Sequence, residues 1–482
     1  MKIFRIFLIF FAYFALYITN IYADISPEIL ENVRKGVITI DSRISISAYH
    51  DTGNFKGTGF IADKKAGLVI TNAHVVTPAS IGIYYTTFFN GKQSEAKLLY
   101  YDSWQDFAIL KIDPKEFPED SKNIAFAKEA PKLGQEVFIV GNNESQGFSF
   151  HSGYLSNLYD IAGSMPQHTY VVNLNVTGGS SGSPLINDKG EALGINYGGS
   201  KTYGLSLKGE YIIHALNAIR NGKIPARKHM GAVTSVYSLD KAVNHRNFPK
   251  KIMEDYIKQY PEYRNKIIRV EYSLNSSGSH NLLMPGDIIW QVNGKNLGAN
   301  LYLLDSEMNK AADKIALKIY RNGEELNLQI PLYNILDYQV SKLVDFAGAI
   351  IFMADDFTAA KSGLPLGNVG FVNVKQGSGM SKVPTFVRYG DKISYRLSID
   401  KLNNNKITDL DSVINLLPKI TKEKFITIDF TNYQPYVENF NGTLQSGHNS
   451  MSSDITLDAL DIKPRIMEFN PKKGIWDVYE AR

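Results

Sequence analysis

The chain has 482 residues, with 52 basic and 48 acidic side chains and a formal net charge of +4. A chain of this length is expected to divide into roughly two to four domains. The basic residues are scattered rather than gathered in one stretch, so nucleic acid is not an expected partner. The sequence contains no cysteine, which excludes disulfides, thiolate catalysis and cysteine-bound zinc.

The first residues have the order of a secretory signal peptide. Lys2 and Arg5 precede an apolar run from Ile6 to Ile18, and the small Ala23 comes before a polar stretch. The run is short for a membrane-spanning helix, which needs about 20 residues. We therefore expect residues 1–23 to be a signal peptide, with an uncleaved anchor as the alternative. In either case the bulk of the protein would be exported, periplasmic or secreted, and tethered if the signal stays uncleaved.

The next part of the chain, 24–225, is dominated by short segments rich in Val, Ile, Tyr and Phe. Gly, Asn and Asp separate these segments, a spacing that predicts an all-β sandwich or barrel. One helix is expected at 209–223, because its apolar residues recur at helical spacing and Gly222 follows as a stop. The stretch 224–229 is typical of a linker.

Two further modules, 230–335 and 345–435, repeat one order of elements: a Gly-Asp pair, a strand, a turn, a helix and another strand. In the first module the pairs Asn293-Gly294 and Asn322-Gly323 lie between apolar segments and predict hairpins. The remaining segment, 436–482, is polar and rich in Asn, Ser and Gly, and we expect it to be partly flexible.

Serine chemistry requires a base, a group that orients this base, and backbone donors for the oxyanion. Of the nine histidines, only His74 ends an apolar segment and is followed by a second apolar pair. A lone histidine is more often structural than functional. His214 lies on the predicted helix and is expected to be structural, and His151 is a weaker competitor for the base.

Asp106 is the candidate for the orienting carboxylate. It immediately precedes the apolar run Phe107–Leu110, where a strand start would bury its carboxylate at the edge of a core. Asp102 and Asp113 look like turn residues, which is also the ordinary alternative for any single aspartate.

The glycine-rich stretch 178–184, GGSSGSP, offers the nucleophile. A backbone that turns several N–H groups toward one point needs glycine, since side chains would clash or forbid the required torsion angles. Ser180, Ser181 and Ser183 all lie in this stretch. The residue pattern alone leaves the choice among the three serines open.

Taken together, GTGFIAD, GLVITNAHVV, DFAILKID and GGSSGSPLIND resemble the HtrA/Deg branch of chymotrypsin-fold serine proteases. The chain order is His, Asp, Ser, and the family's serine sits in a Gly-x-Ser-Gly-x-Pro frame that only Ser181 fits. The resemblance implies that Ser181 is the nucleophile, His74 its base and Asp106 the orienting residue. It also implies an oxyanion hole lined by the backbone of Gly179, Ser180 and Ser181.

The resemblance extends beyond the protease segment. The stretch LLMPGDIIWQVNGKNL, 282–297, is similar to the core of a PDZ domain, and the second repeat resembles a degenerate one. The expected fold class is mainly β: a chymotrypsin-like double β-barrel protease domain at 24–225, a PDZ domain at 230–335 and a PDZ-like module at 345–435. The sequence of the serine motif is most similar to that of the yeast nuclear HtrA-like protease and the long plant Deg proteases.

The function that this resemblance implies is a serine endopeptidase that cleaves unfolded or damaged proteins outside the cytoplasm. The PDZ-like modules would take peptide ligands, and the family suggests a homotrimer and loops such as 155–170 that gate activity. No cofactor or metal is expected, because no clustered His and carboxylate spacing appears. The alternatives are a catalytically silent chaperone or peptide-binding scaffold on the same fold, and an enzyme of this fold that acts on another substrate such as a small ester.

Overall fold

The computed structural model describes residues 25–482, apart from 50–51, 144–145, 373, 384–387, 390–391, 394–396, 434–436, 439–443, 446–447, 458–462, 472 and 481–482. The predicted signal peptide and the Gly-Asp pair of the second repeat lie outside the described residues. In the described part, no helix combines the length and the apolar character that crossing a bilayer would require.

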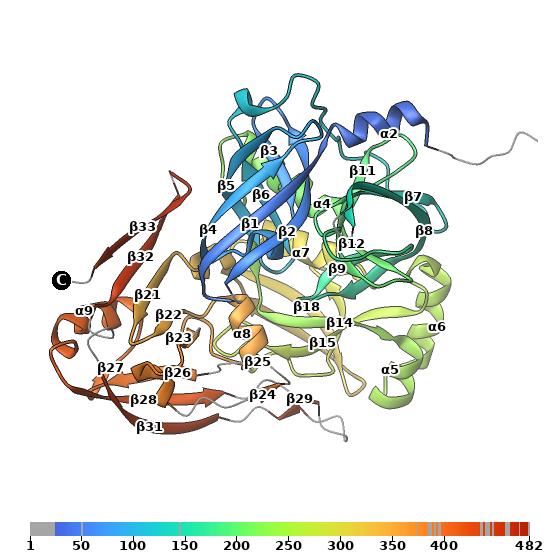
Figure 1. The fold of residues 1–482 in the computed structure, drawn as a ribbon. Coiled ribbons are helices and arrows are strands. Elements are labelled where there is room, and N and C mark those ends of the chain that lie inside the picture. The colour runs from blue at the N-terminus through green and yellow to red at the C-terminus, as the bar shows by residue number, and fades with distance from the viewer. Residues whose placement is uncertain are drawn as a thin grey trace, which may run out of the picture.

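Two closed six-stranded barrels form the first half of the molecule (Figure 1). The first barrel consists, in chain order, of β1 (Val37–Ser47), β2 (Gly53–Asp63), β3 (Leu68–Thr71), β4 (Ser80–Thr87), β5 (Gln93–Asp102) and β6 (Phe107–Lys111). The second consists of β7 (Glu136–Asn143), β8 (Gln146–Ala162), β9 (Gln167–Asn173), β10 (Pro184–Ile186), β11 (Ala192–Gly199) and β12 (Gly204–Lys208).

The two barrels share an apolar core. Phe60 and Phe107 from the first barrel and Phe138 from the second are almost fully buried in the same cluster. Burying side chains of this size removes much apolar area from water, which is the dominant favourable term in folding. The barrels are therefore packed directly on one another, and the edges where they meet are held in fixed relation.

Short helices accompany the barrels. They are α2 (Pro27–Arg34), α3 (Ala73–Val76), the 3₁₀ turn η1 (Pro114–Glu116) and α4 (Gly209–Arg220). Helix α4 confirms the helix predicted at 209–223, and its residues Ile212 and Leu216 pack into the shared core. The mainly β class with a double barrel is confirmed.

The predicted linker at 224–229 is not a free connection. Arg227 and His229 are 3% and 4% exposed, and β13 (Lys228–His229) pairs with β20 (Tyr333–Asn334). The expectation was wrong because the polar composition of the stretch did not reveal its buried partners, which lie far away in the sequence.

A five-stranded path forms the next sheet, in the order β14 (Ala232–Ser238), β15 (Lys266–Ser273), β16 (Ile288–Val292), β18 (Lys314–Arg321) and β19 (Glu324–Pro331), with β17 (Lys295–Asn296) beside β16. Its helices are α5 (Leu239–Arg246), α6 (Lys250–Gln259), η2 (Pro261–Tyr263) and α7 (Leu301–Lys310). Both predicted Asn-Gly hairpins are confirmed. Their residues have positive φ angles of 49° and 77° in one turn and 51° and 90° in the other, as two-residue hairpin loops require.

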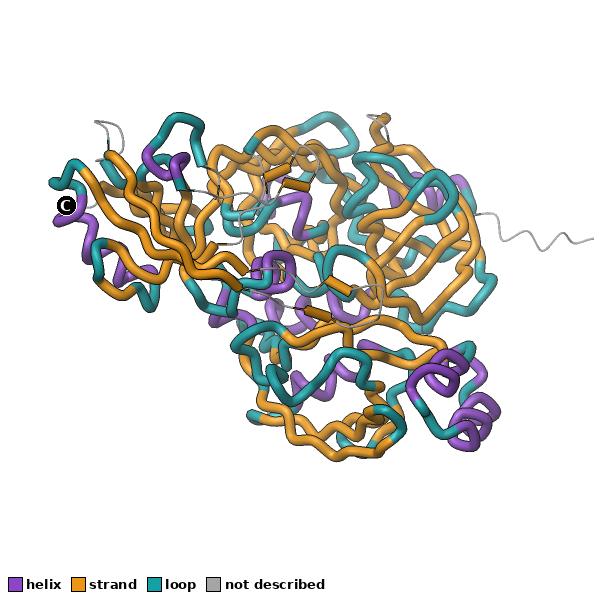
Figure 2. The backbone as a smooth tube through the Cα atoms, turned by 90° about the horizontal axis from the view of Figure 1, so that it is seen from below, coloured by secondary structure: helices purple, strands orange, loops and turns teal. Residues whose placement is uncertain are grey.

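The last sheet runs in the order β31 (His448–Thr456), β28 (Phe425–Tyr433), β26 (Leu397–Leu402), β23 (Val369–Val372), β22 (Ala349–Met353), β21 (Lys342–Phe346), β32 (Arg465–Asn470) and β33 (Ile475–Glu480), with β27 (Asn405–Lys406) beside β26. The accompanying elements are η3 (Ile335–Tyr338), α8 (Asp356–Ser362), η4 (Gly379–Lys382), α9 (Leu410–Ile420), the pair β24 (Arg388–Tyr389) and β25 (Lys392–Ile393), and the pair β29 (Val437–Glu438) and β30 (Leu444–Gln445). Strands from the segment 436–482 thus complete the sheet of the second repeat. Figure 2 shows strands in both barrels and in the two C-terminal sheets, with helices and loops between them.

Candidate active site

His74 and Asp106 lie at one edge of the first barrel. Helix α3, which carries His74, follows β3 directly, and Asp106 comes one residue before β6. Strands β3 and β6 are neighbours, with Thr71 opposite Ala108. The end of one strand and the start of the other therefore meet, and this brings the two side chains together.

The contact between them is close and doubled. His74 Nδ1 lies 2.7 Å from Asp106 Oδ2, and the backbone N–H of His74 donates to Asp106 Oδ1 at 2.9 Å. The side-chain amide of Asn72 donates to the backbone carbonyl of Asp106 at 2.8 Å. One carboxylate thus fixes both the backbone and the ring of the histidine, which sets the orientation of the ring and favours the proton on Nδ1.

The electrostatics of the pair suit a base. Burial favours the neutral ring of His74, but the negative charge of Asp106 and the hydrogen bond to it outweigh this and raise the pKa of His74 above its ordinary value. The His74 side chain is 42% exposed and that of Asp106 is 12% exposed. The imidazole therefore faces the solvent side of the barrel edge, while the carboxylate behind it is largely shielded.

The loop between β9 and β10 carries the three candidate serines and is held from the first barrel. The N–H of Thr58, in β2, donates to the carbonyl of Ser181 at 2.8 Å, and the Thr58 hydroxyl donates to the carbonyl of Gly179 at 2.8 Å. The backbone N–H of Asn142 donates to the same hydroxyl at 2.9 Å. Thr58 is fully buried, so the loop is fixed by contacts that solvent does not compete for.

The three serines differ in their surroundings. Ser180 is buried, its hydroxyl donates to the carbonyl of Thr177 at 2.7 Å, and Asn196 Nδ2 donates to the Ser180 hydroxyl at 3.1 Å. Ser183 is fully buried, and its hydroxyl has no hydrogen-bond partner in the described chain. Ser181 is only partly buried. Of the three, Ser181 alone combines partial exposure with a hydroxyl that is not engaged by the loop.

Backbone donors of the kind that stabilise an oxyanion lie in the same loop. Gly179 and Gly182 have φ angles of +95° and +86°, which only glycine adopts without strain. The carbonyls of Gly179 and Ser181 point to Thr58, and within the described residues the amides of these two residues donate no hydrogen bond. Both N–H groups are therefore available to a developing negative charge.

Gly57 lies between the histidine helix and the serine loop. A Cβ atom built on Gly57 would be 2.6 Å from Val75 Cγ1 and 3.3 Å from the carbonyl oxygen of Ser181. Val75 follows His74 in α3, so α3 and the serine loop both come close to the same residue of β2. No hydrogen bond links His74 to Ser181 in the part of the chain that the structure describes, a contact that often tightens only with substrate bound.

The other candidates lie elsewhere. His214 is on α4, as expected, and His151 is on β8. Asp113 accepts from the N–H of Lys115 as a cap, as expected of a turn residue. Asp102 is a turn residue, as expected, since its Oδ1 accepts the backbone N–H groups of Trp104 and Gln105; in addition, its side chain is 2% exposed and pairs with Arg227 at 2.8 Å. Over the residues described, no group of three or more His, Asp or Glu side chains could hold a metal ion.

Sequence reasoning missed the residues that support the site. Thr58 and Asn196 bond the serine loop and Asn142 bonds Thr58, yet none of the three was singled out from the sequence. The only available signal was the position of Thr58 between two glycines in the segment GTGF, where small neighbours allow a close approach of another backbone.

Comparison with known proteins agrees with this geometry. Residues 57–195 match the family model described as a trypsin-like peptidase domain. The chain is 41% identical over 186 residues to the uncharacterized protein RP187 of Rickettsia prowazekii, a match that takes in 38% of this chain and 96% of that protein. It is 27% identical over 467 residues to the pro-apoptotic serine protease NMA111 of Phaeosphaeria nodorum, covering 93% of this chain but only 43% of that relative.

The chain thus spans less than half the length of that fungal relative. Among solved structures, the HtrA-type protease AlgW with tripeptide is 18% identical, with a TM-score of 0.46, and the match covers 63% of this chain and 97% of that chain. The chain belongs to the HtrA family of serine endopeptidases, which have a trypsin-like peptidase domain.

Proposed function

We propose that Ser181 attacks the carbonyl carbon of a peptide bond and that His74 removes the proton of its hydroxyl. His74 then gives this proton to the leaving amine, and Asp106 keeps the imidazole in the orientation and tautomer that both transfers need. The observation that carries the proposal is the 2.7 Å contact between His74 Nδ1 and Asp106, at the barrel edge that also holds the serine loop.

The oxyanion of the tetrahedral intermediate would be held by the amides of Gly179 and Ser181. Both amides lack an acceptor in the described chain, while their carbonyls are turned to Thr58. Donors fixed in this way need no rearrangement when the charge develops, and removing one such donor typically costs about 10²–10³ in rate. Ser180 lies between them and would support the hole through its contact with Asn196.

The substrate class is inferred from the residues that could line a specificity pocket. Neither 173–178, before the nucleophile loop, nor 194–204, in β11 and the turn after it, contains an acidic residue. A pocket built from these stretches would lack the negative charge that selects Lys or Arg. We infer a preference for small or medium apolar residues on the acyl side of the cleaved bond, in unfolded or damaged proteins.

The setting of the protein is a further part of the proposal. The basic, apolar and small residues of 1–23 support export, with the peptidase outside the cytoplasm. Peptide ligands for the two C-terminal modules and assembly into a homotrimer are carried over from the family resemblance alone.

The experiment compares three serine variants of the full chain. Ser181→Ala abolishes cleavage of unfolded casein and labelling by a fluorophosphonate, while the fold stays intact. Ser183→Ala keeps activity and stability. The deleted hydroxyl is buried without a hydrogen-bond partner among the described residues, and such a group destabilises the folded state, so its removal is tolerated. Ser180→Ala keeps its labelling and loses only part of its rate.

Casein cleavage by pure Ser181→Ala would refute the assignment. Loss of labelling in Ser183→Ala alone would move the nucleophile to that residue. An intact wild-type protein that neither cleaves nor labels would instead indicate a silent scaffold.

A further inference from the structure

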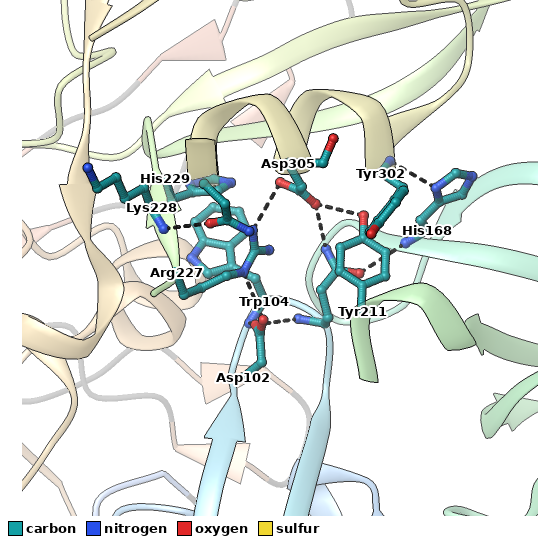
Figure 3. A network of polar contacts seen from close by, with 12 residues as sticks. Asp102, Trp104, His168, Tyr211, Arg227, Lys228, His229, Tyr302 and Asp305 are labelled. Atoms are coloured by element: carbon teal, nitrogen blue, oxygen red, sulfur yellow. Dashed lines mark hydrogen bonds and ion pairs between the residues drawn. The ribbon is translucent and has the colours of Figure 1, made fainter. Parts of the chain in front are cut away.

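The turn between β5 and β6, residues 102–106, carries Asp106 and is folded around a buried carboxylate. Asp102 Oδ1 accepts the backbone N–H groups of Trp104 and Gln105, both at 3.0 Å. Asp102 Oδ2 pairs with Arg227 Nε at 2.8 Å. The conformation of the turn therefore depends on the position of Asp102, and Asp102 is held by a residue outside both barrels (Figure 3).

A second carboxylate completes this ion cluster. Asp305, on α7, lies 3.3 Å from Arg227 Nη1, and its Oδ2 accepts from the Tyr211 hydroxyl at 2.7 Å and from Gln105 Nε2 at 3.3 Å. The side chain of Arg227 is 4% exposed and those of Asp102 and Asp305 are 2% exposed. Figure 3 shows Arg227 between the two carboxylates, with Tyr211, from α4, on the other side of Asp305.

Trp104 fixes the turn from the other side. It is fully buried and its ring lies against His229, with a centroid distance of 3.7 Å. It belongs to an apolar cluster with Leu274 from the β14–β19 sheet region and Ala359 from α8. Its carbonyl accepts from Gln167 Nε2 at 3.2 Å. Both C-terminal sheets therefore contribute to the packing of a turn that belongs to the first barrel.

Asp106 itself has a φ angle of +53°, a left-handed conformation that is costly for a residue other than glycine. Such conformations persist only where the surroundings impose them. Here the surroundings are the tight turn that precedes Asp106 and the contacts of Asp106 with α3 and Asn72. If Asp102 lost its cation, its buried charge would be driven toward water and would release the two amides that shape the turn.

We infer that Arg227, together with Asp305, is a positioning residue of the peptidase: it holds the 102–106 turn so that Asp106 stays in contact with His74. This inference rests on the proposed function, since it assigns Arg227 a role in the geometry of the proposed triad. The segment 224–229, whose composition suggested only a linker, would then help to position the catalytic residues.

The test uses two variants of the full chain and one matched control. Arg227→Met removes the cation but keeps much of the volume, and Arg227→Lys keeps the charge but loses the planar guanidinium that meets two carboxylates. The control is Asp287→Asn. Asp287 is a buried aspartate paired with Arg321 at 2.7 Å, and both residues lie in the β14–β19 sheet region, away from the turn.

The decisive readout is the pKa of His74, followed by NMR of protein carrying labelled histidine. In the wild type the charge of Asp106 raises this pKa. A carboxylate that retreats from the ring lowers it, and a merely structural role of Arg227 leaves it unchanged. We expect a lower His74 pKa in Arg227→Met, a smaller decrease in Arg227→Lys and no change in Asp287→Asn.

Kinetics provide the second readout, normalised to the fraction of protein that a fluorophosphonate titrates. A displacement of about 1 Å at a catalytic group can cost about 100-fold in rate, so we expect kcat to fall about 10- to 100-fold in Arg227→Met with KM little changed. The acid limb of the pH profile should move to lower pH in the same variant. If Arg227→Met does not fold, Arg227→Lys decides alone by the same two readouts.

An unchanged His74 pKa in the folded Arg227 variants overturns the inference, even if kcat falls. Failure of the proposed function looks different: the wild type would then lack activity that depends on Ser181, while the NMR titration would still report whether Arg227 controls the contact between His74 and Asp106.

Discussion

Gly57 lies close to both the histidine helix and the serine loop, and the variant Gly57→Ala tests whether their spacing matters. A Cβ atom at this position would approach Val75 Cγ1 and Cγ2 to 2.6 and 2.7 Å and the Ser181 carbonyl oxygen to 3.3 Å. Val75 is 4% exposed and β-branched, so it has little freedom to move aside. The added methyl group must displace α3, the serine loop or both.

The expected cost follows from the overlap. Contacts below 3.0 Å force a shift of several tenths of an ångström, and overpacking of a buried site typically costs about 1–3 kcal/mol. For a cooperative unit of about 200 residues, each kcal/mol lowers Tm by about 2–4 °C. Because the displaced backbone carries His74 or Ser181, a further loss of about 10- to 100-fold in kcat is expected.

The assay combines thermal unfolding with casein cleavage, and Gly147→Ala is the matched control. Gly147 also lies in a barrel strand, but among the described residues its added Cβ would come close only to Asn142 Oδ1, at an ordinary 3.8 Å. We expect the control to match the wild type in Tm and kcat. If Gly57→Ala equals Gly147→Ala in both measurements, Gly57 does not set the spacing of the site.

Two pH-dependent predictions follow from groups whose pKa is shifted. The proposed base works in its neutral form, so kcat/KM rises as the pH increases through the raised pKa of His74. Asp106→Asn should lower kcat by up to about 10⁴-fold and move this acid limb of the pH–rate profile to lower pH. An acid limb that does not move would contradict the pairing of His74 with Asp106. Burial raises the pKa of Asp356, which accepts from the Tyr333 hydroxyl, to about 8. The folded protein thus retains a proton that the unfolded chain releases near pH 4, and the free energy of unfolding falls as the pH rises from there to about 8, by up to about 1.4 kcal/mol per pH unit. Asp356→Asn should reduce the corresponding decline of Tm between pH 5 and 8, and an equal decline in both proteins would show that this carboxyl does not carry the effect.

Local signals in the sequence were sufficient for the strands that flank His74 and Asp106, whereas the double barrel and the pairing of these two residues were expected from the family resemblance. The apolar segments that precede the histidine and follow the aspartate are both barrel strands, but they pair across about 40 residues of intervening chain, with Thr71 opposite Ala108. The helix α4 and the two Asn-Gly hairpins were predictable for the same reason, because residue spacing and the tolerance of Asn and Gly for positive φ are properties of a few neighbouring residues.

Contacts between distant residues were not predictable. Asp102 looked like a turn residue, and it does fold a turn, but its partner Arg227 is brought to it only by the tertiary structure. The strands β32 and β33 join the sheet of the second repeat because β32 pairs with β21. These two strands are more than a hundred residues apart, and no local sequence pattern predicts their pairing. The role of Thr58 likewise appears only when two barrels meet.

The most direct test of the proposed catalytic serine is to treat the intact protein with a fluorophosphonate and to locate the label by mass spectrometry of the digested chain. Because only a serine activated by a base reacts readily, we predict a single label, on Ser181, that is absent from His74→Ala. A label on Ser180 or Ser183, or no label on the folded wild-type protein, would contradict the proposed assignment.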